Sequence, residues 1–304
     1  MVPRIQESLF EPLECRHSAL DRRLLKLFRE ARTFEEDRVQ SHSHPQEDGC
    51  LSRNGLLKSL ATEICGGPDP HDIIKADSGN VRLSATDLAN HLACRHLTSL
   101  DFAVAVGTSS APSWQSPDLC VLRERGFALE NAYLEHLAAQ GAVVLNLRDI
   151  VEDERAIAET VAAMEKGAEV IAQATLTSGR WFGRADVLRR VEGASKFGSW
   201  SYEVYDCKLA RETKAATILQ LSLYSELVAA IQGVLPELMY VVPFGLDFRP
   251  EQYRVSDFAA YYRYVKARLE NAVEQKPTTV VEPTIHCDIC RWWPESAGFN
   301  GSSC

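Results

Sequence analysis

The stretch YEVYDCKLA, residues 202–210, places an acid and a base two positions apart in a segment with the apolar pattern of a buried strand. Because side chains alternate between the two faces of a strand, Asp206 and Lys208 point to one side and Cys207 to the other. Two ionisable groups on one face of a central strand are costly unless they meet a metal ion, an opposite charge or water. The alternative interpretation is an Asp–Lys pair on an edge strand that faces water.

A second acid precedes this pair in GRADVL, residues 183–188, where Asp186 lies twenty positions before Asp206. If the two segments are antiparallel neighbours, both carboxylates can reach one ion. Two aspartates suit Mg²⁺ or Mn²⁺, which take oxygen ligands and keep coordinated waters for a substrate phosphate. Lys208 could then orient or deprotonate the attacking water and offset charge on the phosphoryl transition state. The pattern therefore predicts a metal site on the polar side of the strand.

The elements that must position these residues predict an α/β fold. Helical periodicity and capping residues predict helices over 84–105, 119–140, 153–166, 212–233 and 258–274. Apolar runs bounded by turns predict strands over 142–147, 169–176, 180–191, 200–209 and 238–243, with a hairpin turn at GASKFGS. This order of elements predicts a mixed central sheet between helices.

The helix after the DxK strand carries QLSLYSEL, in which Gln220 and Tyr224 share one face at i and i+4. In this order, GRAD, YEVYDCKLA and QLSLYSEL resemble the RecB-like branch of the PD-(D/E)XK nucleases. The likeness extends over about residues 81–295 and is to prokaryotic RecB-like nucleases related to CRISPR-associated iron–sulfur exonucleases. It implies a restriction-endonuclease-like core over residues 81–285.

The resemblance also implies roles for individual residues. Asp186 and Asp206 would be metal ligands, and Lys208 would be the catalytic lysine. Gln220 and Tyr224 match the family's Q-x-x-x-Y element, which supports the site and the DNA strand.

Two further positions follow from the same resemblance. Glu130, in RGFALENAYLEHL, matches the acidic residue of the first motif helix and would be a third ligand. Many relatives carry a histidine immediately before that acid, where this chain has Leu129. The alternative is that Glu130 is a solvent-facing helix residue. Arg184 would contact a substrate phosphate.

The cysteines form a second group. Relatives hold a [4Fe–4S] cluster with one early and three late cysteines, which here implies Cys94, Cys287, Cys290 and Cys304. Because Cys304 is so distant from HCDIC, the tail 286–304 is expected to be incomplete, through truncation or a shifted reading frame. A site of three cysteines, a zinc-filled site and a CxxC that holds no metal remain alternatives.

Composition limits the class of protein. The chain has 304 residues, a net charge of −9 and nine scattered cysteines, with no leader sequence and no apolar tract long enough to span a membrane. We therefore expect a cytoplasmic protein with reduced thiols that does not coat nucleic acid indiscriminately. Residues 1–80 are expected to be an extension, mostly helical or irregular, with an amphipathic helix over 18–34 and a polar linker over 35–49.

The expected function is a Mg²⁺- or Mn²⁺-dependent DNA nuclease that acts on single strands or free ends, in DNA repair, recombination or defence. The resemblance implies a helicase or second nuclease domain as a partner. No P-loop motif is present, so the chain is not expected to hydrolyse nucleotides as a P-loop motor. The first alternative is a catalytically impaired nucleic-acid-binding module with a nuclease fold. The second is a zinc-binding interaction domain around HCDIC, completed by Cys94 and His286. The sequence leaves the oligomeric state open.

Overall fold

The computed structural model describes residues 81–112, 117–245, 247–275, 279, 282, 284, 286–287 and 290–292. The expected N-terminal extension, residues 1–80, lies outside these residues, as does Cys304. Both therefore remain predictions.

One mixed sheet runs through the described part of the chain, with its six strands in the order β1-β2-β3-β4-β5-β6. The strands are β1 (Val144–Asn146), β2 (Val170–Ser178), β3 (Trp181–Ser195), β4 (Gly198–Lys208), β5 (Leu238–Pro243) and β6 (Glu251–Arg254). The β1–β2 and β4–β5 pairs are parallel, whereas β2–β3, β3–β4 and β5–β6 are antiparallel. The expected mixed sheet is confirmed, although the short edge strand β6 was not predicted.

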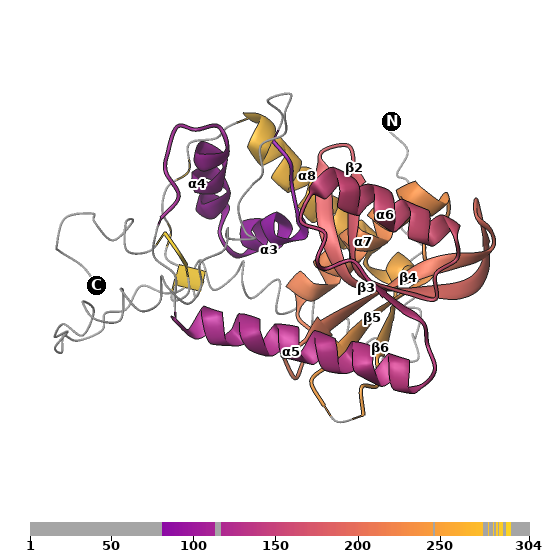
Figure 1. Cartoon of the computed structure of the whole chain (residues 1–304). Coiled ribbons are helices and arrows are strands. Elements are labelled where there is room, and N and C mark those ends of the chain that lie inside the picture. Colours follow the sequence, from indigo (N-terminus) through magenta and orange to yellow (C-terminus); the bar gives the residue numbers. More distant parts are fainter. Residues whose placement is uncertain are drawn as a thin grey trace, which may run out of the picture. The chain divides into compact units, whose positions relative to one another are not determined.

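Helices cover both faces of this sheet. They are α3 (Ala85–Ala93), α4 (Arg95–Ala105), α5 (Pro117–Ala139), α6 (Asp153–Glu165), α7 (Ala215–Gln232) and α8 (Val255–Gln275). α5 lies along one face, and α6 and α7 lie against the other, with α3, α4 and α8 packed beyond α7 (Figure 1). Among the described helices, none combines the length and apolar character needed to cross a bilayer.

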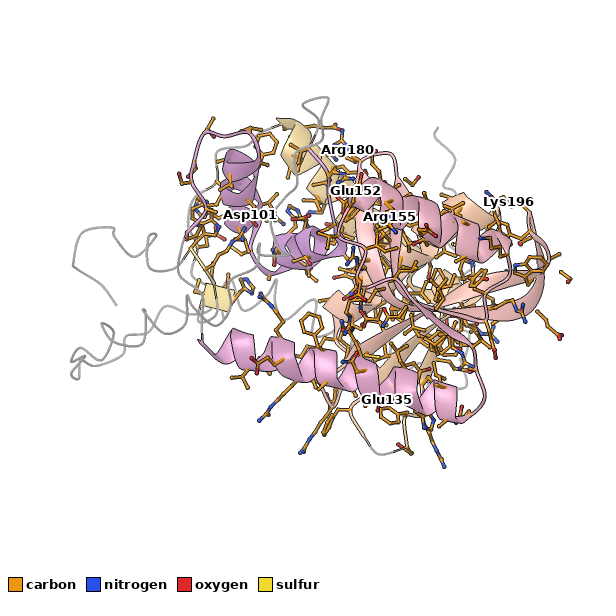
Figure 2. All side chains as sticks on the ribbon, in the orientation of Figure 1. Asp101, Glu135, Glu152, Arg155, Arg180 and Lys196 are labelled. Atoms are coloured by element: carbon orange, nitrogen blue, oxygen red, sulfur yellow. The ribbon has the colours of Figure 1, made fainter. Side chains whose placement is uncertain are left out.

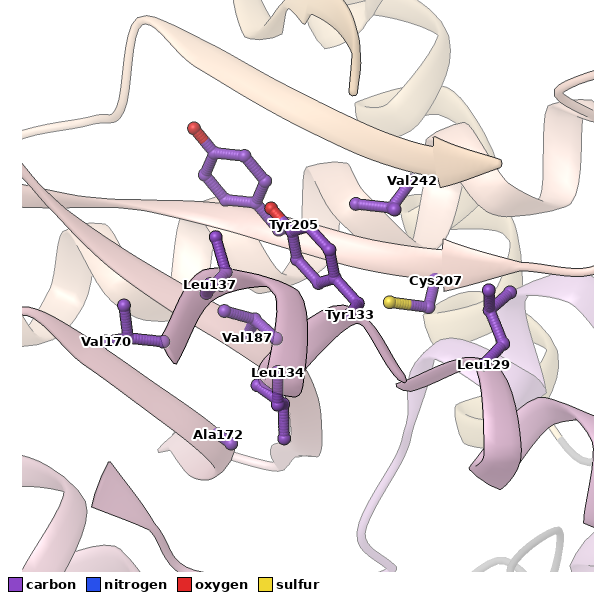
Figure 3. Packing of buried hydrophobic residues seen from close by; sticks show 10 residues of the cluster. All are labelled: Leu129, Tyr133, Leu134, Leu137, Val170, Ala172, Val187, Tyr205, Cys207 and Val242. Atoms are coloured by element: carbon purple, nitrogen blue, oxygen red, sulfur yellow. The ribbon is translucent and has the colours of Figure 1, made fainter. Parts of the chain in front are cut away.

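The face under α5 is held by apolar side chains at helical spacing. Leu129, Tyr133 and Leu137 recur at every fourth position of α5 and pack onto the strands (Figure 3). Their partners on the strands are Val170, Ala172, Val187, Tyr205, Cys207 and Val242. Because Cys207 belongs to this core, its neighbours Asp206 and Lys208 in β4 point to the opposite face, as the alternation predicts.

The expected single helix over 84–105 is wrong, because the chain forms two helices that meet at Cys94. Cys94 has φ −158° and ψ 112°, which is extended backbone, and it serves both as the C-cap of α3 and as the N-cap of α4. Its amide still donates to the carbonyl of Asn90 at 2.8 Å. Helical periodicity continues across the break, so the change of direction comes from packing: α3 packs on α7 and α8, and α4 packs on α8.

Candidate functional site

The site lies at a fork in the sheet. β3 and β4 pair as far as Val187 and Tyr205, and beyond this point β3 continues with β2 while β4 continues with β5. The register would next set Asp186 opposite Asp206. Instead, the Oδ2 atom of Asp186 accepts the backbone N–H of Cys207 at 2.8 Å, so a side chain takes the place of a ladder carbonyl. The two aspartates therefore meet where the strands separate.

Asp206 is fully buried on the interior strand β4, so the edge-strand alternative is wrong. Gln220 of α7 donates its side-chain amide to Asp206 Oδ1 at 2.9 Å. Lys208 Nζ lies 2.7 Å from Oδ2, close enough for an ion pair. Oδ2 nonetheless accepts no well-aligned hydrogen bond from the described residues. Oδ2 of Asp206 is thus stabilised by the positive charge of Lys208 and not by a hydrogen bond within the described part of the chain.

The charges at the fork shift one another's protonation. Burial, and next the charge of Asp206, raise the pKa of Asp186 well above its usual value. Burial lowers the pKa of Lys208, but the carboxylates of Asp206 and Asp186 outweigh it and raise that pKa above its usual value. The side chain of Lys208 is 29% exposed, whereas that of its partner Asp206 is fully buried.

Glu130 reaches the same place from α5. It precedes Leu134 by one helical turn, at the border of the buried stripe, and its side chain is 14% exposed. Arg148 and Gln173 both donate to its Oε2 atom, at 2.7 and 2.8 Å. Burial raises the pKa of Glu130 although Arg148 opposes the shift, and the charge of Asp206 is among the causes. The solvent-facing alternative for Glu130 is therefore wrong.

Gly183 has a role that the GRAD string did not reveal. Tyr224 of α7 is buried, and a Cβ atom on Gly183 would lie 2.4 Å from Tyr224 Cε1. Burial, and then the charges of Asp206 and Asp186, raise the pKa of Tyr224. A glycine inside a strand is a general sign of such a close approach, so the signal was present in the sequence.

Two other residues complete the description of the site. Arg184 donates to the carbonyl of Ile150 at 3.2 Å, so its expected phosphate contact stays a prediction. Gln173, which binds Glu130, was not predicted. The only signal for it is one amide in the buried run VIAQATL of β2.

The oxygen donors at the fork fit a hard divalent cation. Mg²⁺ is ordinarily held by one or two carboxylates together with waters and substrate phosphates, and Asp186 and Asp206 supply two. A cation would balance the charge on Oδ2 of Asp206, which accepts no hydrogen bond from the described residues. It would also reduce the repulsion that raises the pKa of Asp186. However, the described residues contain no group of three or more His, Cys, Asp and Glu side chains arranged to hold an ion. The fit is thus to two carboxylates.

Three of the four expected cluster cysteines lie near one another, but they do not form a three-ligand metal group in the described part of the chain. Cys94, Cys287 and Cys290 are partly buried free thiols. Burial raises the pKa of Cys290, and Cys94 and Cys287 are near enough to raise it further. The fourth candidate, Cys304, lies outside the described residues.

Comparisons with known proteins add little to this geometry. No family model matches the chain, and no curated protein matches it. The chain is similar to a solved structure described as "Crystal structure of SSO0001", at 15% sequence identity and a TM-score of 0.33. The similarity covers 78% of this chain and 91% of that chain.

Proposed function

We propose that this chain is a Mg²⁺- or Mn²⁺-dependent deoxyribonuclease with a RecB-like PD-(D/E)XK core, acting on single strands or free ends. The observation that carries the proposal is the fork, where the Asp186 carboxylate is inserted between two strands beside Asp206 and its partners, Lys208 and Gln220. An acid pair with an adjacent lysine at a break in a sheet is costly for stability alone, and it suits phosphodiester hydrolysis.

The carboxylates would have distinct positions in the reaction. Asp186 and Asp206 would hold the divalent ion, and Glu130 would add negative charge beside them. The ion would supply an activated water and neutralise charge on the phosphate. Gln220 binds Oδ1 of Asp206, which leaves Oδ2 as the oxygen available for coordination.

Lys208 would act as a cation. The neighbouring carboxylates raise its pKa, so it carries its proton at neutral pH and is a poor general base. Its ammonium would donate to the attacking water or to a phosphoryl oxygen and stabilise the negative charge of the transition state. Arg184 and Tyr224 would contact or support the bound strand.

The thiols of Cys94, Cys287 and Cys290 would hold a [4Fe–4S] cluster or a zinc ion, with a fourth ligand from elsewhere. Such a site would join α4 to the C-terminal segment. It would be structural, since the thiols belong to other elements than the fork.

A second candidate function is DNA binding without hydrolysis. The observation in its favour is that Lys208 is paired with Asp206 and Arg148 with Glu130, so that the charges already compensate each other within the described chain. Such a module would keep its affinity for DNA when Asp206 is replaced.

The test is cleavage of end-labelled single-stranded and duplex DNA in Mg²⁺, Mn²⁺ or EDTA. We expect Lys208→Ala to lower the rate by roughly 100-fold or more, because it removes a positively charged donor from the transition state. Lys196→Ala is the matched control: this exposed lysine lies at the tip of the β3–β4 hairpin (Figure 2), and its loss should leave the rate unchanged. DNA binding without metal-dependent cleavage by the wild type would favour the second candidate.

A further inference from the structure

Gln173 holds a backbone conformation that its position does not favour. Its φ is 56°. Among the described residues, one other non-glycine residue, Phe248, has a positive φ, and it lies outside the strands. Residues other than glycine rarely adopt this backbone conformation, and they keep it only where the surrounding structure imposes it. The residue is 8% exposed, so it is held within the packed interior.

This strained position lies directly across from Asp186. On either side of it β2 and β3 are regularly paired, Ala172 with Val187 and Ala174 with Ala185, so the register sets Gln173 opposite Asp186. The pairing of β1 with β2 ends at Ala172. The irregularity therefore coincides with the candidate site.

The consequence is seen in the side chain. Ala172 belongs to the core under α5, so regular alternation would direct residue 173 to the opposite face. Instead, Gln173 Nε2 donates to Oε2 of Glu130, a residue of α5, at 2.8 Å. Arg148 donates to the same oxygen. Both of these hydrogen bonds fall on Oε2, and the other oxygen of the Glu130 carboxylate, Oε1, receives neither.

We propose that Gln173 is a positioning residue of the carboxylate centre, and that its left-handed backbone directs its amide to hold Glu130 beside the metal-binding pair, Asp186 and Asp206. The inference rests on the proposed function. Gln173 would touch neither metal nor substrate. It would act by holding Oε2 of Glu130, so that the Glu130 carboxylate stays close to the pair and adds to the negative charge around the cation, as outer partners of a metal site commonly do. A residue present only to satisfy a buried acid would not require a strained backbone.

Two substitutions separate the amide from the backbone strain. Gln173→Gly removes the amide and relieves the strain, since glycine adopts positive φ freely. Gln173→Glu keeps the size and the strain but replaces the donor with a carboxylate facing Glu130. Gln252→Gly, at an exposed position of β6, is the control for a glycine placed in a strand.

The measurements are Mn²⁺ binding by titration calorimetry without DNA, and the melting temperature in EDTA. We expect both Gln173 variants to bind Mn²⁺ roughly 10-fold to 100-fold more weakly than the wild type. The melting temperature of Gln173→Gly should not fall, whereas Gln252→Gly should bind Mn²⁺ normally and melt slightly lower.

Three results would overturn the inference, and they are distinguishable. Mn²⁺ affinity within twofold of wild type in both variants would show that the hold of Gln173 on Glu130 does not support the metal site. A Gln173→Gly variant that loses melting temperature together with affinity would make the residue merely structural. A wild-type chain that binds no Mn²⁺ would overturn the proposed function itself, and this inference with it.

Discussion

At the scale of single residues, the site depends on side chains that replace main-chain partners. The Asp186 carboxylate satisfies the Cys207 amide at the point where the ladder ends, so the fork leaves no buried donor without an acceptor there. The same replacement brings a carboxylate next to Asp206, and the repulsion between the two is offset by Lys208. One side chain thus ends the ladder and brings the two carboxylates together.

Gly183, the smallest residue at the site, leads to a specific prediction. Gly183→Ala would place a methyl group 2.4 Å from Tyr224 Cε1, so the ring must move. We expect a loss of about 1–3 kcal/mol of unfolding free energy, measured by denaturation, and, under the proposed function, slower cleavage of DNA. Gly126→Ala in α5 is the control, because its Cβ would meet no atom within 4 Å, and it should be neutral or stabilising.

Combining the change with Tyr224→Ala tests the mechanism. If the clash with the ring is the cause, Gly183→Ala should cost little in a background that lacks the ring. Equal destabilisation in both backgrounds would contradict it.

At the scale of elements, the first of the two helices that meet at Cys94, α3, begins with a partly buried polar cap. Asp87 is buried in the first turn of α3, where its Oδ2 accepts the backbone N–H and the hydroxyl of Ser84, each at 2.7 Å. Burial raises the pKa of Asp87 to about 7, and the Ser84 hydrogen bonds only partly oppose this. The cap is therefore most favourable when the acid is neutral.

This shift predicts a pH-dependent gain from Asp87→Asn. The folded pKa of about 7 lies above the unfolded value of 3.8, so the stability from Asp87 is fully present below pH 3.8 and is lost as the pH rises through 7. An amide can accept the same hydrogen bonds but cannot ionise. Relative to its effect at pH 4, the variant should gain roughly 2–4 kcal/mol of unfolding free energy by pH 8, measured by chemical denaturation.

Asp257→Asn provides the control for that series, because it removes an exposed carboxylate from the first turn of α8. A constant difference between Asp87→Asn and wild type from pH 4 to 8 would show that burial does not raise the pKa of Asp87.

At the scale of the whole described chain, distant segments are joined at α4. Asp101 of α4 is buried (Figure 2 labels it), and its Oδ1 accepts hydrogen bonds from Arg291 at 2.5 Å and from the Trp292 indole at 2.9 Å. These contacts hold the C-terminal segment against the first helices, next to Cys287 and Cys290. A charged pair of this kind is costly to break, because both side chains lie largely out of contact with water, with 14% of Arg291 and 1% of Asp101 exposed.

Asp101→Ala should therefore release the C-terminal segment. We expect a loss of about 3 kcal/mol of unfolding free energy and faster alkylation of Cys287 and Cys290, followed by mass spectrometry. The matched control is Asp153→Ala, which removes a more exposed pair with Arg82 and should cost less than about 1 kcal/mol. Unchanged alkylation with lowered stability would mean that the segment is held by other contacts.

Much of the architecture could be predicted from local patterns. The amphipathic stripe of α5, the strands on either side of GASKFGS and the helix carrying Gln220 and Tyr224 were expected close to their observed limits. Periodicity and turn residues report such elements because they reflect which side of a segment is buried. The short strand β6 and the break at Cys94 have no such local pattern. They depend on which elements are available to pack against them.

For the candidate site, the sequence alone determined which side chains share a face: Asp206 with Lys208 through the strand repeat, and Gln220 with Tyr224 through the helix repeat. Only the tertiary structure decided that β3 and β4 separate at Asp186, that Glu130 arrives from the opposite face, and that Gln173 is strained to meet it. The physical reason is that face and spacing follow from the geometry of one element. Separation, approach and strain are set by the balance of contacts among several elements, which no local pattern contains.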